Sequence, residues 1–229
     1  MDRRALLAGR AGAWARCRAI LRRYAVSWLF LAGFGVAWAV SVALPASRQS
    51  ALLWWASTDV ENLRHDPEGS LVASAFLPDG GFLTWVPLIA LAMFGANRAL
   101  GNARTALVVA AGQVVGTLVS EGIVAYRIGH ELLPAADDRI MDVGPSYVVV
   151  SAIVVAVLFG TWPARIAAGV CFALLVGPGD IFGGLSTLQV AAVGHVTAIA
   201  VALLLAPLLI RGRARATPGP APVSAPAED

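Results

Sequence analysis

The sequence contains no lysine, only two cysteines and few charged residues. All 17 basic residues are arginine, which we attribute to the base composition of a high-GC bacterial genome rather than to mechanism. Cys17 lies in a basic N-terminal region and Cys171 in an apolar segment, so neither predicts a disulfide framework, a metal site or a thiol nucleophile. The net charge of +3 gathers beside apolar segments, which indicates a topology signal rather than a nucleic-acid footprint.

Long apolar runs dominate the rest of the chain. Hydrophobic residues make up 58% of its 229 residues, and the runs are continuous rather than alternating. We therefore expect one all-α polytopic membrane bundle: a cytoplasmic Arg-rich N-terminus (1–23), a six-helix membrane domain (24–210) and a disordered cytoplasmic tail (211–229). The six predicted spans are 24–44, 82–96, 105–126, 146–161, 166–176 and 188–210.

The arginines are distributed unevenly between the two sides of these spans. Six spans place both termini on one side, which collects 13 arginines, whereas the other side has four. The positive-inside rule then predicts a multi-pass protein of the bacterial plasma membrane with both termini in the cytoplasm. The stretch 46–81 mixes acids with tryptophans, which predicts a loop in the membrane interface ending in a turn at Pro78–Gly81.

The segment from Asp142 to Tyr147 leads directly into the fourth span. Pro145 suits the first turn of a helix because its missing N–H would have no partner there. Ser146 then lies beside free backbone N–H groups, which suit a nucleophile because the same donors stabilise an oxyanion. The alternative is a serine that only caps an ordinary membrane helix.

Two ionisable residues fall within spans, where such groups are costly and therefore candidates for function. Glu121 lies in the third span and His195 in the sixth, at a depth similar to that of Ser146. A neutral imidazole can take the proton of a hydroxyl, so Ser146 and His195 together suit nucleophilic catalysis. Small residues at four-residue spacing predict close helix approach on the third span (Gly112, Gly116, Ser120) and the sixth (Gly194, Ala198, Ala202, Ala206). The alternative is a histidine that only hydrogen-bonds between helices.

The sequences Val143-Gly144-Pro145-Ser146 and Gly194-His195-Val196 resemble the signature of the rhomboid intramembrane serine proteases. The segment from Phe94 to Gly101, the long first loop and the six-span layout are similar to that family as well, over residues 24–210. The resemblance implies a Ser146–His195 dyad that cleaves transmembrane protein substrates near the outer face, in a lipid bilayer, with no cofactor, metal or nucleic acid.

The chain also departs from the family pattern around the implied site. Tyr147 stands where the family has its second glycine, so Gly144 and Tyr147 are expected to shape the site. Gly81 and Trp85 stand where helix two carries a histidine and an asparagine that bind the oxyanion. The loss of one such donor lowers the rate by ~10²–10³ in other serine hydrolases. The alternative function is therefore a catalytically inactive rhomboid-like protein that binds transmembrane clients.

Two further polar residues lie in the third span. Glu121 is a candidate to orient the imidazole, against the alternative that it extends to the outer surface. Gln113 is expected to form a hydrogen bond between helices rather than to contact an oxyanion. A transporter that uses Glu121 ranks last, because the sequence has no inverted repeat.

Overall fold

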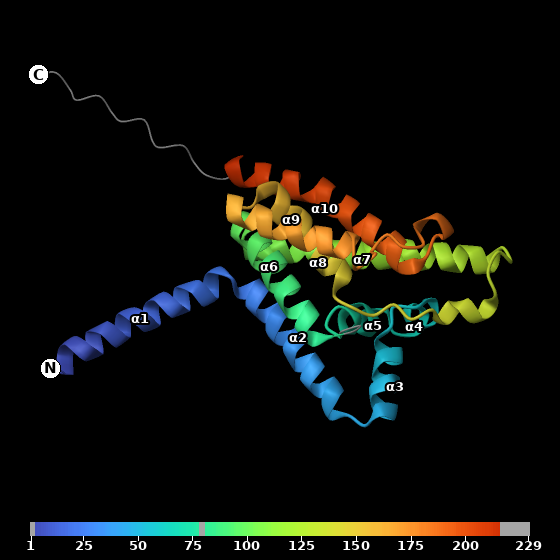
Figure 1. Ribbon diagram of the computed structural model, residues 1–229, viewed down its shortest axis with the longest axis horizontal. Coiled ribbons are helices and arrows are strands. Elements are labelled where there is room, and N and C mark those ends of the chain that lie inside the picture. The colour runs from blue at the N-terminus through green and yellow to red at the C-terminus, as the bar shows by residue number, and fades with distance from the viewer. Residues whose placement is uncertain (1–2, 78–80, 216–229) are drawn as a thin grey trace, which may run out of the picture.

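The structure is a computed structural model that describes residues 3–77 and 81–215 (Figure 1). Within these residues the chain is helical and has no strand. The helices are α1 (Arg3–Arg23), α2 (Ala25–Ala43), α3 (Ala46–Ala56), α4 (Val60–His65), α5 (Pro67–Ser74), α6 (Phe82–Leu100), α7 (Asn102–Gly129), α8 (Ser146–Phe159), α9 (Trp162–Val176) and α10 (Val190–Arg215), with short 3-10 helices at Ala135–Arg139 and Leu185–Thr187.

Six of these helices correspond to the six predicted spans. Among the described residues, α2, α6, α7 and α10 are long and apolar enough to cross a membrane, and α8 and α9 are shorter apolar helices. The predicted all-α polytopic bundle is confirmed. The second span is longer than predicted, because α6 continues to Leu100 through an internal Pro87.

Helix α8 forms the centre of the bundle. Every residue from Tyr147 to Ala156 is buried, and α8 packs against α6, α7, α9 and α10. A helix that is apolar on all sides must be covered on all sides, which explains this position. Its 14 residues span about 21 Å at 1.5 Å per residue, less than the roughly 30 Å of a hydrocarbon core. One end of α8 therefore lies below the membrane surface.

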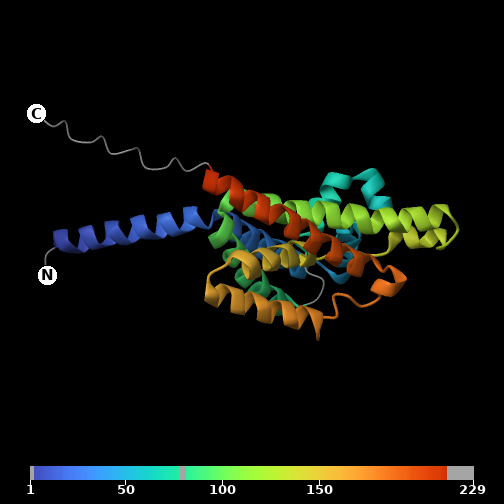
Figure 2. The same cartoon turned by 90° about the horizontal axis from the view of Figure 1, so that it is seen from above.

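Small residues bring α7, α8 and α10 close together, as the sequence predicts. A Cβ at Gly116 of α7 would lie 3.1 Å from the carbonyl oxygen of Gly194 in α10, and a Cβ at Gly112 would overlap the side chain of Ser151 in α8. Ala198, Ala202 and Ala206 of α10 are fully buried. In two views at right angles, α7 and α10 run side by side (Figures 1 and 2).

The stretch expected to be an interfacial loop is instead three short helices, α3 to α5. Asp59 caps α4 by accepting a hydrogen bond from the N–H of Asn62 at 2.9 Å, and Asp66 caps α5 by accepting one from Gly69 at 2.9 Å. Pro67 occupies the first turn of α5. The predicted turn at Pro78–Gly81 lies largely outside the described residues.

The first helix projects away from the bundle, and the last helix is longer than predicted. Helix α1 extends outward from α2, so the Arg-rich N-terminus is helical over Arg3–Arg23 (Figures 1 and 2). Helix α10 continues to Arg215, so five residues assigned to the disordered tail by the sequence analysis are helical. The remainder of that tail, 216–229, lies outside the described residues.

Candidate functional site

Ser146 is the first residue of α8, as the sequence predicts, and it follows Pro145. It is half-buried. The first turn of a helix has backbone N–H groups without intrahelical partners, and a helix N-terminus favours negative charge. Among the described residues, the Ser146 hydroxyl has no hydrogen-bond partner. Its position suits a nucleophile, but nothing activates its oxygen.

The side chain of His195 in α10 is held by a hydrogen bond to the loop that precedes this helix. Its Nδ1 lies 2.8 Å from the carbonyl oxygen of Ile181, and its side chain is 5% exposed. A carbonyl oxygen only accepts hydrogen bonds, so Nδ1 carries the proton and Nε2 has a free lone pair. Nε2 is buried and has no partner among the described residues. The tautomer is that of a base, but no donor reaches it, so the structure does not join Ser146 to His195.

Tyr147 is the α8 side chain that contacts the imidazole. The two rings meet edge to face, with centroids 5.2 Å apart and an interplanar angle of 81°. The ring lies against Gly194, where an added Cβ would overlap it. Its hydroxyl donates to Asp142 Oδ2 at 3.0 Å and approaches the carbonyl oxygen of Val190 at 3.4 Å. Because successive helix residues point about 100° apart, the neighbouring Ser146 faces a different direction.

The loop before α8 is hydrogen-bonded to the connection between α3 and α4 and to the end of α5. Thr58 donates its N–H to the Asp142 carbonyl oxygen at 2.9 Å and its hydroxyl to Asp142 Oδ2 at 3.2 Å. The N–H of Gly144 donates to the carbonyl oxygen of Ser74 at 3.0 Å, so it is not a free oxyanion donor. Gly144 has a φ of 144°, in the region that favours glycine. Gly144 therefore shapes the loop, whereas its amide is already occupied.

The two polar residues of α7 do not support the imidazole. Glu121 is 2% exposed, and neither of its carboxylate oxygens has a hydrogen-bond partner among the described residues. Gln113 donates from Nε2 to the Ser74 hydroxyl at 3.2 Å, so it forms the interhelical bond that the sequence predicts. The partner that orients His195 is instead the backbone carbonyl of Ile181, which side-chain patterns do not reveal.

The remaining candidate positions lie at the edges of the bundle. Gly81 immediately precedes α6, and Trp85 lies in its first turn, packed against the core. His65 and His130 are exposed, and each Nδ1 meets a carbonyl oxygen of its own helix, at 2.9 and 2.8 Å. In the part of the chain that the structure describes, no three His, Cys, Asp or Glu residues are placed to hold a metal ion.

A lateral cavity of about 640 Å³ separates α6 from α9. Leu88 and Leu91 line it on the α6 side, and Val170 and Leu175 on the α9 side. Leu91 and Val170 are exposed, so the cavity opens toward the surrounding lipid. The N–H of Ile181 donates to the carbonyl oxygen of Leu175 at 3.1 Å, so the wall of this cavity continues into the loop that holds His195.

The family model described as rhomboid-like protein matches residues 19–216, which includes all six apolar helices. No curated protein and no solved structure matches the chain.

Proposed function

On the premise that the chain belongs to the family of rhomboid-like proteins, which the match over residues 19–216 shows, we propose that it binds transmembrane segments of other proteins without cleaving them. The observation that carries this proposal is the contact between Tyr147 and His195. The residue beside the base is an aromatic ring fixed by Asp142, and the base has no hydroxyl donor.

The covered base explains why hydrolysis is not expected. A serine hydroxyl becomes a nucleophile when a neighbouring base accepts its proton, which needs a separation of about 2.6–3.2 Å. His195 Nε2 has no partner among the described residues, and the amide of Gly144 is already bonded to the carbonyl oxygen of Ser74. Neither activation of Ser146 nor a loop donor for an oxyanion is therefore in place.

The cavity between α6 and α9 supports the binding part of the proposal. It is apolar, opens to lipid and holds about 640 Å³, which suits several side chains of a membrane helix. Association of helices in a bilayer depends on packing rather than on the hydrophobic effect, so a preformed recess favours a helix over lipid tails. The excess of arginine on the side of the termini supports a plasma-membrane orientation with both termini in the cytoplasm.

Serine-reactive labelling tests the absence of catalysis. The full chain in detergent is treated with a fluorophosphonate probe, beside Ser146→Ala and His195→Ala variants and an active serine protease as a positive control. We expect equal background labelling of all three forms of this chain. Labelling of the wild type that both substitutions abolish would contradict the proposal.

Photocrosslinking tests client binding. A photoreactive phenylalanine analogue is placed at Leu91 or Val170, which line the cavity, and at Leu204 of α10, which is exposed but does not line it. We expect protein adducts in membranes from the first two positions and not from Leu204, and we expect them to persist in a Ser146→Ala background. Equal adducts from all three positions would refute a specific client site.

The second candidate function is an intramembrane serine protease, which the free lone pair of His195 Nε2 favours. In that case Tyr147 moves aside and Nε2 takes the proton of Ser146 as its oxygen attacks a peptide carbonyl. The imidazolium then gives the proton to the leaving amine as the C–N bond breaks, and a water molecule, deprotonated by the same Nε2, hydrolyses the acyl ester and restores the Ser146 hydroxyl. This function predicts probe labelling lost in Ser146→Ala, together with cleavage of a bound client.

A further inference from the structure

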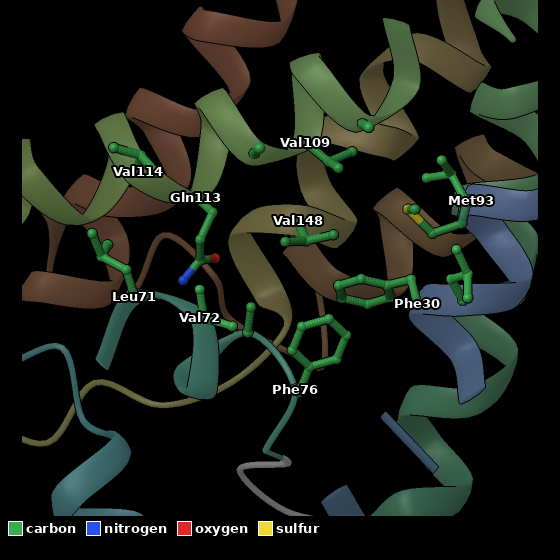
Figure 3. Close-up of a pocket in the computed structure, with 14 residues that line it drawn as sticks. Phe30, Leu71, Val72, Phe76, Met93, Val109, Gln113, Val114 and Val148 are labelled. Carbon is green, nitrogen blue, oxygen red and sulfur yellow. The ribbon is translucent and has the colours of Figure 1, made fainter. Parts of the chain in front are cut away.

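A second recess lies on another side of the bundle, between α2, α5 and α7. It has a volume of about 350 Å³, and Val148 of α8 forms part of its floor. Figure 3 shows Phe30 of α2 and Phe76 just beyond α5 on one side, with Val109 and Gln113 of α7 on the other. This α2–α5–α7 cavity is separate from the site around His195 and from the cavity between α6 and α9.

Among the described residues that line this cavity, Gln113 is the one whose side chain has an unsatisfied polar atom. It is 5% exposed, and its Nε2 is fixed by the hydrogen bond to Ser74. Its Oε1 has no hydrogen-bond partner among the described residues. In Figure 3 the amide of Gln113 extends into the space between Val72 and Val148. A buried acceptor without a donor is destabilising, and this cost disappears when a donor binds.

The α2–α5–α7 cavity opens toward lipid. Leu29 and Val72 on its rim are 71% and 61% exposed, and Ala110 of α7 is exposed. Helices α2 and α7 are joined at one end, where the Asn102 side chain accepts a hydrogen bond from the Val26 N–H at 3.2 Å. Away from this junction α2 runs beside α6 and diverges from α7 (Figure 1). A molecule can therefore enter from the bilayer without passing through water.

The lining defines the chemistry of the ligand. None of the described residues that line the cavity is charged, so a charged headgroup would be buried without a partner among them, at a large cost. Apolar side chains suit a hydrocarbon chain, and one acceptor requires one donor. The volume lies within the range of small-molecule sites.

We propose that the α2–α5–α7 cavity binds a neutral lipid with a free hydroxyl group, such as a long-chain alcohol or an acylglycerol. The hydrocarbon chain lies beside Phe30 and Phe76, and the hydroxyl donates a hydrogen bond to Gln113 Oε1. Binding is non-covalent and does not depend on client binding or on catalysis.

The test uses two photoreactive probes that differ in one group. The full chain is reconstituted in phosphatidylcholine nanodiscs and irradiated with a diazirine-bearing long-chain alcohol or with its methyl ether. Adducts are quantified and mapped by mass spectrometry. We expect adducts in α5 and α7, with the alcohol labelling about fivefold more than the ether, the effect of roughly one hydrogen bond. Excess unlabelled alcohol and excess unlabelled diacylglycerol show which source of the hydroxyl competes better.

Two substitutions and a matched control locate the site. Gln113→Leu removes the acceptor, so alcohol labelling should fall to the level of the ether while ether labelling stays unchanged, which also shows that the cavity is intact. Ala110→Phe fills the cavity from its exposed side and should abolish labelling by both probes. Val115→Phe places the same ring on the exposed face of α7 outside the cavity and should change neither.

Several results would overturn the proposal. These are equal labelling of the wild type by alcohol and ether, a preference for the alcohol that survives Gln113→Leu, and labelling that survives Ala110→Phe. If Gln113→Leu fails to fold, two measurements still test the proposal. They are the ratio of alcohol to ether labelling in the wild type, and the comparison of labelling in Ala110→Phe and Val115→Phe.

Discussion

Gly194→Ala is the substitution that most strongly probes the packing of Tyr147 against α10. A Cβ at this position would overlap Cζ and Oη of Tyr147, so the ring must move from the surface of His195. Overpacking of this kind costs about 1–3 kcal/mol. Displacement of the hydroxyl from Asp142 adds about 0.5–1.5 kcal/mol for one lost hydrogen bond, because the single hydroxyl hydrogen is shared with the more distant Val190 carbonyl oxygen. We expect a total loss of about 2–4 kcal/mol in the free energy of unfolding.

A double-mutant cycle isolates the contact. In a Tyr147→Ala background there is no ring to displace, so Gly194→Ala should cost less than about 0.5 kcal/mol, which gives a coupling energy on the order of 2 kcal/mol. Gly122→Ala in α7 is the control, because a Cβ there meets no other atom within 4 Å. It should be neutral or slightly stabilising, since alanine favours a helix over glycine.

The assay is reversible unfolding in mixed micelles with increasing dodecyl sulfate, followed by circular dichroism. Equal costs of Gly194→Ala in the presence and in the absence of the Tyr147 ring would refute the packing described here. A result of that kind would mean that the ring of Tyr147 lies elsewhere and does not cover the imidazole of His195.

Three further predictions concern the site, the opposite end of the bundle and the topology. Tyr147→Phe should destabilise the protein by about 1 kcal/mol through the lost bond to Asp142, whereas Ser146→Ala should change stability by less than about 0.5 kcal/mol; the reverse order in the same unfolding assay would be inconsistent with the hydrogen bonds. Asn97→Ala should lower the free energy of unfolding by about 1–2 kcal/mol, because the Asn97 amide donates to Ser27 Oγ at 3.1 Å and to Asn102 Oδ1 at 2.9 Å. An unchanged midpoint in the same unfolding assay would count against these hydrogen bonds. Cys17 is exposed and should react with a membrane-impermeant maleimide only after cells are permeabilised, whereas Cys17 labelling in intact cells would place the N-terminus outside.

The sequence was sufficient to predict the bundle because its signals are strong in a membrane. Long apolar runs have few alternatives in lipid, so the six segments emerged as helices. The start of α8 at Ser146 followed from Pro145 and the apolar run behind it. The small residues Gly116 and Gly194 indicated that α7 and α10 approach closely, which the structure confirms.

The short helices and the side-chain contacts around His195 were harder to predict from the sequence. The helices α4 and α5 could have been found, because Asp59 and Asp66 are N-cap residues and Pro67 follows the second of them. The bond from His195 to the Ile181 carbonyl carries no side-chain signature and depends on the path of the preceding loop. The contact of Tyr147 with the imidazole depends on helix rotation, because a change of one residue turns a side chain by about 100°.

The most direct test of the account is nuclear magnetic resonance of the imidazole of His195 in the reconstituted full chain. The chain has three histidines, so His195→Ala assigns the signal. We predict that Tyr147→Leu shifts the His195 ring resonances, because it removes the edge-to-face ring, and that Ser146→Ala leaves the Nε2 resonance unchanged. A shift of Nε2 on Ser146→Ala, with no response to Tyr147→Leu, would show that the serine and not the tyrosine is the partner of the base.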